Sequence, residues 1–265
     1  DKSRVSATHV VLDGEEFHHI VGVCRQEVGS RFEVLVEGNQ ALLVELETLS
    51  KKSAIARVIE SRKVPSLPQP WLNLVMGVPR FPVFEAVLEK CVELGVKSVT
   101  PLFSDFSFVK SEIPFSKQDR WSKIIKSATQ QSGRGDLMVL QSPQKIANYL
   151  HEYSCLNVQK YGLFAYEGET TLNLKQAVGR ILLSTLESKS VQGHRVGQNE
   201  SGQIPPEVYL FVGGEGGWSV QEAELFRSKG LEPVTLGSQV LRVETACIAL
   251  LSVLKYELDL WRRFE

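Results

Sequence analysis

The sequence of 265 residues is predicted to fold as an α/β protein with a mostly parallel sheet, preceded by a small antiparallel β-barrel domain. Apolar residues alternate at period two between residues 31 and 63, which is typical of antiparallel strands. Residues 64–70 contain three prolines and are typical of a linker. Beyond them, short apolar runs alternate with amphipathic helical stretches. We therefore assign residues 1–68 to the barrel and residues 69–265 to the α/β domain.

In the predicted barrel, short polar turns at residues 37–40 and 50–53 separate three strands. The alternating positions that mark these strands are Phe32, Val34, Val36, Leu42, Val44, Leu46, Ile55, Arg57 and Ile59. Alternation of this kind favours a sheet that is buried on one face.

The second domain reads as strands followed by helices. The expected strands are residues 72–78, 99–103, 162–166 and 208–212. A helix over residues 82–94 ends at Gly95, which suits the C′ position. Further helices are expected to begin at Ser116, with Asp119 completing a capping box, and at Ser219, with Glu222 in the same role. A final helix covers residues 244–261, and the polar residues 187–207 are interpreted as a mobile surface insertion.

Composition and charge exclude some classes of protein. Apolar content of 43%, charged content of 23% and a net charge of −1 are ordinary for a globular protein, so a polyanion could bind only at a local basic patch. The four cysteines are widely spaced and form no CxxC motif, which predicts reduced thiols and no metal site. Neither a membrane-spanning apolar run nor a signal-peptide pattern is visible, so we expect a cytoplasmic protein with no membrane partner.

Residues 213–217 read GGEGG, between a predicted strand and a predicted helix. Ligands of α/β sheets bind at this position, beyond the carboxyl ends of the strands. The loop matches neither GxGxxG nor GxxxxGK(S/T), and a central glutamate would repel a phosphate. The expected ligand is therefore neutral or cationic where it meets the loop. The alternative is a tight connection that needs glycines only for positive φ angles.

A second unusual stretch, TLGSQVLRVETA, covers residues 235–246 and opens the final helix. Glu244 is favoured by the dipole at a helix N-terminus, whereas Arg242 is not. An arginine in this place suggests a functional role, and a surface ion pair is the alternative.

These two stretches closely resemble the paired GPEGG and LGPRILRTETA motifs of SPOUT-class RNA methyltransferases. The nearest match is the family that methylates N3 of a uridine in the 16S ribosomal RNA of the small subunit. Residues 89–96 resemble its KxxELGV motif, residues 128–134 its A-x-Q/E-Q-S-G-R segment, residues 165–167 its YEE strand and residues 18–29 its H-x-x-x-V-L-R-x-x-x-G signature. The chain departs from the family at Gly214 (proline), Ser238-Gln239 (Pro-Arg), Val243 (threonine) and Phe81-Pro82-Val83 (a lysine-containing stretch).

The resemblance implies a SPOUT fold with a C-terminal trefoil knot, a PUA/OB-like RNA-binding barrel and a homodimer. It also implies that S-adenosylmethionine binds, bent, in the three loops of the knot. The cofactor-binding residues carried over are Tyr166, Glu167, Val212, Gly213, Gly214, Glu215, Gly216, Gly217, Leu236, Gly237, Val240, Leu241 and Ala246. The glycines would let the backbone press against the donor, whose sulfonium tolerates the carboxylate of Glu215.

Methylation at N3 requires loss of a weakly acidic imide proton, and negative charge then spreads onto O2 and O4. Arg242 is predicted to stabilise that charge with paired donors. Glu215 or Glu244 is the predicted proton acceptor, unless these carboxylates only brace the loops.

RNA contacts are predicted for a basic helix face and the first domain, and a solvated helix face is the alternative. The residues are Arg25, Lys117, Arg120, Lys123 and Arg134, with Lys126 on the same face. Two functional alternatives stay open at this point. One is a SPOUT enzyme for a tRNA or large-subunit RNA, and the other is an RNA-binding relative without catalysis.

Overall fold

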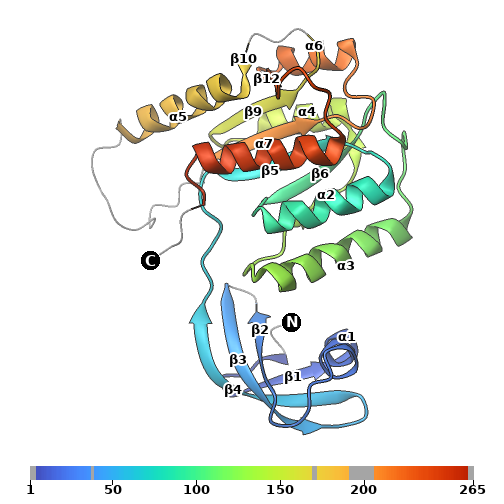
Figure 1. The fold of residues 1–265 in the computed structure, drawn as a ribbon, viewed down its shortest axis with the longest axis vertical. Coiled ribbons are helices and arrows are strands. Elements are labelled where there is room, and N and C mark those ends of the chain that lie inside the picture. The colour runs from blue at the N-terminus through green and yellow to red at the C-terminus, as the bar shows by residue number, and fades with distance from the viewer. Residues whose placement is uncertain (1–3, 37–38, 169–171, 191–205, 262–265) are drawn as a thin grey trace. The chain divides into compact units, whose positions relative to one another are not determined.

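A computed structural model describes residues 4–36, 39–168, 172–190 and 206–261 (Figure 1). By its contacts the chain forms two compact units. The first holds residues 1–66 together with Thr129–Leu137, and the second holds the remainder. Each unit has a hydrophobic core of its own.

The first unit is built on an antiparallel sheet of four strands in the order β1-β4-β3-β2. These are β1 (His9–Asp13), β2 (Arg31–Val36), β3 (Gln40–Leu49) and β4 (Ser53–Lys63). The short helix α1 (Gly14–Phe17) and the π-helix η2 (His18–Val23) follow β1. Within the described residues β1 and β2 are the two edges, so the predicted barrel is a half-barrel. Two register shifts between β3 and β4 supply the bends that curl it.

The sequence pattern predicted that the face of β4 with Ile55 and Ile59 is buried, but the structure buries the opposite face. Ile55 and Ile59 are 41% and 38% exposed, whereas Ala54 and Ala56 are buried. The pairing with β3 decides this, because Ala56 lies opposite the buried Leu46 and antiparallel partners share a face. A small residue is thus packed against a large one, which single-strand alternation could not reveal.

The second unit contains an eight-stranded sheet in which all pairings are parallel, as the sequence predicted. The strand order is β10-β12-β9-β11-β5-β6-β7, and β8 also pairs with β6. The strands are β5 (Trp71–Gly77), β6 (Ser98–Phe103), β7 (Val139–Leu140), β8 (Gln144–Lys145), β9 (Lys160–Ala165), β10 (Leu172–Asn173), β11 (Glu207–Val212) and β12 (Glu232–Thr235).

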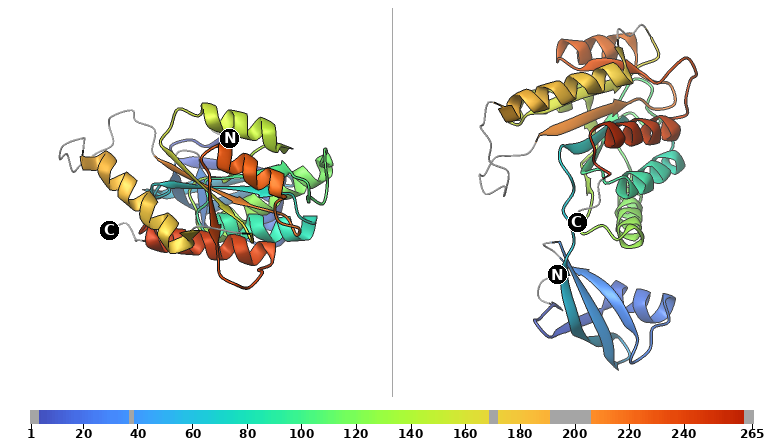
Figure 2. Two further views of the ribbon diagram at one scale, coloured as in Figure 1. Left: turned by 90° about the horizontal axis from the view of Figure 1, so that it is seen from above. Right: turned by 60° about the vertical axis from the view of Figure 1, so that its left-hand side comes forward.

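Helices cover both faces of this sheet (Figure 2). One face packs against α2 (Phe81–Glu93), α3 (Phe115–Ser132), α5 (Leu174–Ser190) and α7 (Val243–Glu257). The other packs against α4 (Ile146–Cys155) and α6 (Val220–Ser228). The central strand β11 is buried along its whole length, with Leu210 in one core and Phe211 in the other. No helix in the described part of the chain is long and apolar enough to cross a membrane.

The helix ends test the local predictions. The capping box of Ser219 and Glu222 is confirmed in both directions. The one expected at Ser116 is wrong, because the helix begins at Phe115 and the Pro114 carbonyl accepts from the N–H of Gln118. Asp119 pairs with a lysine instead, its carboxylate 3.0 Å from the Lys123 ammonium.

The final helix stops at Glu257 rather than at residue 261. Asp259 adopts φ +58°, and Leu260 donates its N–H to the Lys255 carbonyl, which is a Schellman stop. Helices α4 and α5 were not predicted, although the buried residues of α4 stand at the i, i+3, i+4, i+7 spacing that would reveal it. Of the predicted insertion, residues 187–190 continue α5, and residues 191–205 lie outside the described residues.

Candidate functional site

A pocket of 180 Å³ lies where the carboxyl ends of β9, β11 and β12 meet the start of α7. Every predicted cofactor-binding residue except Glu215 lines it. The lining also includes Ala165, Trp218, Val234, Thr235, Ser238, Gln239 and Val243. Three segments far apart in sequence are therefore brought to one site by the parallel sheet, as the strand–loop–helix pattern predicted.

The glycine loop at residues 213–217 is closed against the protein itself. Gly217 has φ +69° and donates its N–H to the Gly214 carbonyl at 2.9 Å. A Cβ atom on Gly213 would lie 2.5 Å from the Gly217 backbone, and one on Gly216 would lie 2.7 Å from the Phe106 side chain. A Cβ on Gly214 would meet only ordinary contacts of 3.5 Å or more. At three of the four positions, glycine thus serves the tight turn and its neighbours.

Glu215 is not among the residues that line the pocket. Its Oε1 accepts a hydrogen bond from the backbone N–H of Arg80 at 3.0 Å, and the residue is exposed. This contact ties the glycine loop to the loop after β5, where Gly77 lets the Gly214 backbone approach closely. The observed contact is the bracing one that the sequence left open for this carboxylate.

The segment between β12 and α7 is open by comparison. Within this segment, the Thr235 hydroxyl donates a hydrogen bond to the Gly237 carbonyl at 3.0 Å and accepts one from the N–H of the same glycine. In the described part of the chain, none of the backbone N–H groups of residues 238–241 donates to a protein group. Val240 is 75% exposed. These groups are available to a ligand.

Arg242 is the N-cap of α7 and stands between the pocket residues Leu241 and Val243. Its side chain is exposed, and no carboxylate among the described residues pairs with it. A cation at the positive end of a helix dipole is unfavourable for stability, so this placement needs a compensating role. Glu244, in the first turn of α7, is half-buried.

The charge of the pocket is decided by one residue. Among the described residues that line the pocket, Glu167 is the only one with a charged side chain. The indole N–H of Trp218 is buried and has no hydrogen-bond partner among the described residues. Such a pocket fits a ligand that is cationic near Glu167 and carries hydrogen-bond acceptors, which is the chemistry of S-adenosylmethionine.

Cys247 lies one residue beyond the pocket residue Ala246 and is fully buried. Burial, and secondarily the charge of Glu244, raises the pKa of its thiol to about 12. The thiol is therefore neutral near pH 7 and does not act as a thiolate nucleophile. Among the described residues no cluster of histidine, cysteine and carboxylate groups could hold a metal ion.

Three of the predicted RNA-binding cations already have carboxylate partners. Arg120 lies 2.8 Å from Glu85, and Lys123 is paired with Asp119. The guanidinium of Arg134 is buried and donates twice to Asp136 at 3.0 Å, so it is not presented to a phosphate. Lys117 instead stands over the ring of Phe81, 5.3 Å from its centroid.

Arg25 lies in the first unit, two residues after the end of η2. It is exposed and has φ +53°, an uncommon backbone conformation for a residue with a side chain. It remains a prediction as an RNA contact.

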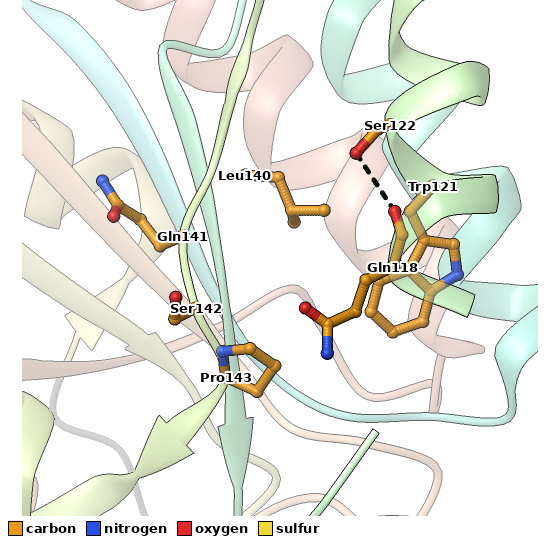
Figure 3. Close-up of a pocket in the computed structure, with 7 residues that line it drawn as sticks. All are labelled: Gln118, Trp121, Ser122, Leu140, Gln141, Ser142 and Pro143. Carbon is orange, nitrogen blue, oxygen red and sulfur yellow. Dashed lines mark hydrogen bonds between the residues drawn. The ribbon is translucent and has the colours of Figure 1, made fainter. Parts of the chain in front are cut away.

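A second cavity, of 110 Å³, lies between α3 and residues 140–143 (Figure 3). Its lining is neutral and includes Gln118, Trp121 and Gln141. The side-chain amide of Gln118 donates a hydrogen bond to the Ile113 backbone carbonyl. The backbone carbonyl of Gln118 accepts a hydrogen bond from the Ser122 hydroxyl. This cavity contains no titratable group and none of the predicted catalytic residues.

Comparison with known proteins identifies the family. The family model for RNA methyltransferase domains matches residues 65–255, and that for the PUA domain of RNA methyltransferases matches residues 12–59. The chain belongs to the RNA methyltransferase family. The relationship suggested by the GGEGG and LRVETA motifs is thereby confirmed.

Relatives align over most of the chain. The Bacillus subtilis protein named ribosomal RNA small subunit methyltransferase E is 28% identical over 262 residues, covering 95% of this chain and 91% of its own. The Synechocystis protein of that name is 27% identical, covering 89% of this chain and 69% of its own.

Solved structures agree in fold. A Legionella pneumophila protein crystallised with bound SAM superposes with a TM-score of 0.74 at 26% identity, over 94% of this chain and 91% of its own. The Neisseria gonorrhoeae ribosomal RNA small subunit methyltransferase E, bound to S-adenosyl methionine, has a TM-score of 0.72 at 21% identity, over 95% and 93%. The latter comparison supports the fold alone.

Proposed function

We propose that this protein methylates N3 of a uridine in the 16S ribosomal RNA of the small subunit, with S-adenosylmethionine as donor. The observation that carries the proposal is the pocket itself. It unites the two family motifs, its described lining carries one charged side chain, a carboxylate, and it borders on an arginine that no described carboxylate neutralises. The names of the relatives support the same substrate.

S-adenosylmethionine, when bound, supplies an electrophilic methyl group on a sulfonium. Glu167 would face the positive charge, and the free N–H groups of residues 238–241 and of the Trp218 indole would bind acceptor atoms. The glycine loop gives one wall of the pocket a fixed shape, because its turn is closed by its own hydrogen bond.

Uracil N3 has to lose its proton as it gains the methyl group, and the negative charge appears on O2 and O4. Arg242 would donate to those oxygens, since the residue is exposed and stands in sequence between the pocket residues Leu241 and Val243. Glu244 is the better candidate for proton acceptor, directly or through water. The carboxylate of Glu215 is occupied by the Arg80 backbone and lies outside the lining.

The rest of the proposal concerns assembly and RNA binding. Residues 1–68 would form the PUA-like RNA-binding domain and residues 69–265 the SPOUT domain, whose pocket loops would form a trefoil knot. A homodimer is supported by the apolar side chains that α7 leaves exposed, namely Ile248, Val253 and Tyr256. We propose a cytoplasmic location, where small subunits are the substrate.

The decisive experiment is methyl transfer from labelled S-adenosylmethionine to small subunits that lack the modification. We expect N3-methyluridine in digested 16S RNA, identified by mass spectrometry. Labelling of a tRNA or of large-subunit RNA instead would contradict the proposed substrate. An S-adenosylmethionine affinity too weak to detect by calorimetry would favour a non-catalytic RNA-binding relative. Light scattering at micromolar protein should give a dimer, and a monomer would contradict the proposed assembly.

A further inference from the structure

Two phenylalanine rings are exposed on the loop that follows β6. Phe106 is 49% exposed and Phe108 is 54% exposed. Because β6 is parallel to its neighbours, this loop lies at the same edge of the sheet as the pocket loops (Figure 1). Phe106 also packs beside Gly216, which lines the pocket. Large apolar rings next to a catalytic pocket suggest a binding surface.

Hydrogen bonds anchor this loop to the rest of the domain, so the exposure of the two rings is not the result of a poorly anchored backbone. The N–H of Asp105 donates to Glu222 at 2.8 Å, and its carboxylate accepts from the Ser219 hydroxyl at 2.6 Å. The N–H of Phe108 donates to the Val78 carbonyl at 2.8 Å. The Phe108 ring then stands edge-on to Phe81, with centroids 5.4 Å apart and planes at 82°. Phe108 is therefore about half-exposed although its backbone is hydrogen-bonded and its ring packs on Phe81.

Three cations on segments next to the two rings have no carboxylate partner among the described residues. Arg80 and Lys117 form no ion pair with any described residue. Lys110 donates to the backbone carbonyls of Ser104 and Asp105, and no carboxylate in the described part of the chain pairs with it. The helix face beyond them differs, because Arg120 and Lys123 are neutralised.

We propose that Phe106 and Phe108 form a stacking platform for unpaired RNA bases that flank the methylated nucleotide. Arg80, Lys110 and Lys117 would bind the adjoining phosphates. The chemistry is that of single-strand recognition, in which aromatic side chains stack on bases while cations follow the backbone. The proposal rests on the proposed function for the identity of the RNA. Since N3 lies on the pairing edge of uracil, the target base must be unpaired when it is methylated, and the platform would bind unpaired neighbours of that base.

A second protein copy fits this surface less well. The buried centre of a protein interface is depleted of charge, and burying three cations without carboxylates would be costly. Single-stranded RNA suits this surface better, because its bases can stack on the rings and its phosphates can pair with the cations.

Phe108 is the residue to test, because Phe106 touches the pocket loop and could alter donor binding. Full-length protein would be titrated with a fluorescent single-stranded oligouridylate of roughly ten nucleotides. Phe108→Ala and Phe108→Leu should each weaken binding about tenfold or more, and Phe108→Tyr should stay within about threefold, because only the aromatic residue keeps a stacking face. S-adenosylmethionine affinity and the thermal midpoint serve as the controls for folding.

If Phe108→Leu binds the oligonucleotide as well as the native protein, the ring does not stack and the platform is refuted. A shift of the Ala variant from dimer to monomer in light scattering, with unchanged RNA affinity, would assign the rings to a subunit interface instead.

Methyl transfer to undermethylated small subunits separates this proposal from the proposed function. The platform predicts that Phe108→Ala raises KM about tenfold and leaves the single-turnover rate at saturation within about threefold. If native protein fails to methylate small subunits but oligonucleotide binding still requires the ring, the platform stands and the substrate assignment fails. If methylation proceeds with equal KM in both proteins, the platform fails alone.

Discussion

The two motif segments of the pocket differ in how they use their backbones. Residues 213–217 are closed, because Gly217 bonds to Gly214 and Glu215 is bound to Arg80. Residues 238–241 are open, because no acceptor among the described residues takes their N–H groups. They lead to Arg242, with which no described carboxylate pairs. The glycine-rich segment therefore gives the pocket its shape. The segment with free N–H groups is the one that can bind the ligand and lead to the reacting base.

The largest effect is expected at the open segment. Arg242→Ala should slow single-turnover methylation by about a hundredfold, because a donor to the developing oxyanion is lost. S-adenosylmethionine affinity should be nearly unchanged, since this interaction forms only as N3 loses its proton. Arg242→Lys should recover little, because an ammonium cannot reproduce the planar fork. Rapid-quench kinetics and calorimetry provide the measurements.

A loss of RNA affinity in Arg242→Ala, with an unchanged rate at saturation, would instead make Arg242 a phosphate contact. The open segment would then bind substrate without taking part in the chemistry.

The closed segment predicts a contrast between adjacent glycines. Gly213→Ala should destabilise the protein by about 1–3 kcal/mol and weaken S-adenosylmethionine binding, because its Cβ would overlap the Gly217 backbone. Gly214→Ala is the matched control and should cost less than about 1 kcal/mol, since its Cβ meets only ordinary contacts. Thermal unfolding and calorimetry compare the two. Equal effects would mean that the loop is not held closed as described.

The smallest effect is expected at Glu215. Glu215→Gln keeps the oxygen that accepts from Arg80, so the single-turnover rate should stay within about threefold of the native rate. The corresponding Glu244→Gln change is the comparison, because loss of a general base typically costs about a hundredfold or more. A hundredfold loss at Glu215 would show that this carboxylate accepts the proton and that its brace breaks during catalysis.

The sequence by itself determined the features that depend on near neighbours in the chain. The capping box at Ser219 forms because its two partners are three residues apart, and Gly95 ends α2 because it alone adopts the required positive φ without strain. The helix and strand periods likewise revealed β5, β6, β9 and β11. The motif pair supplied the family. All but one of the residues that the resemblance assigns to the cofactor line the pocket.

Only the tertiary structure decided features that depend on distant partners. The outward face of Ile55 follows from the pairing of β4 with β3, and the task of Glu215 follows from Arg80, 135 residues earlier in the chain. The same holds for the basic helix face, where Arg120 looked free until Glu85 of α2 was seen beside it. Whether a side chain is buried or its charge is paired depends on residues that are distant in sequence, and local sequence patterns do not specify those contacts.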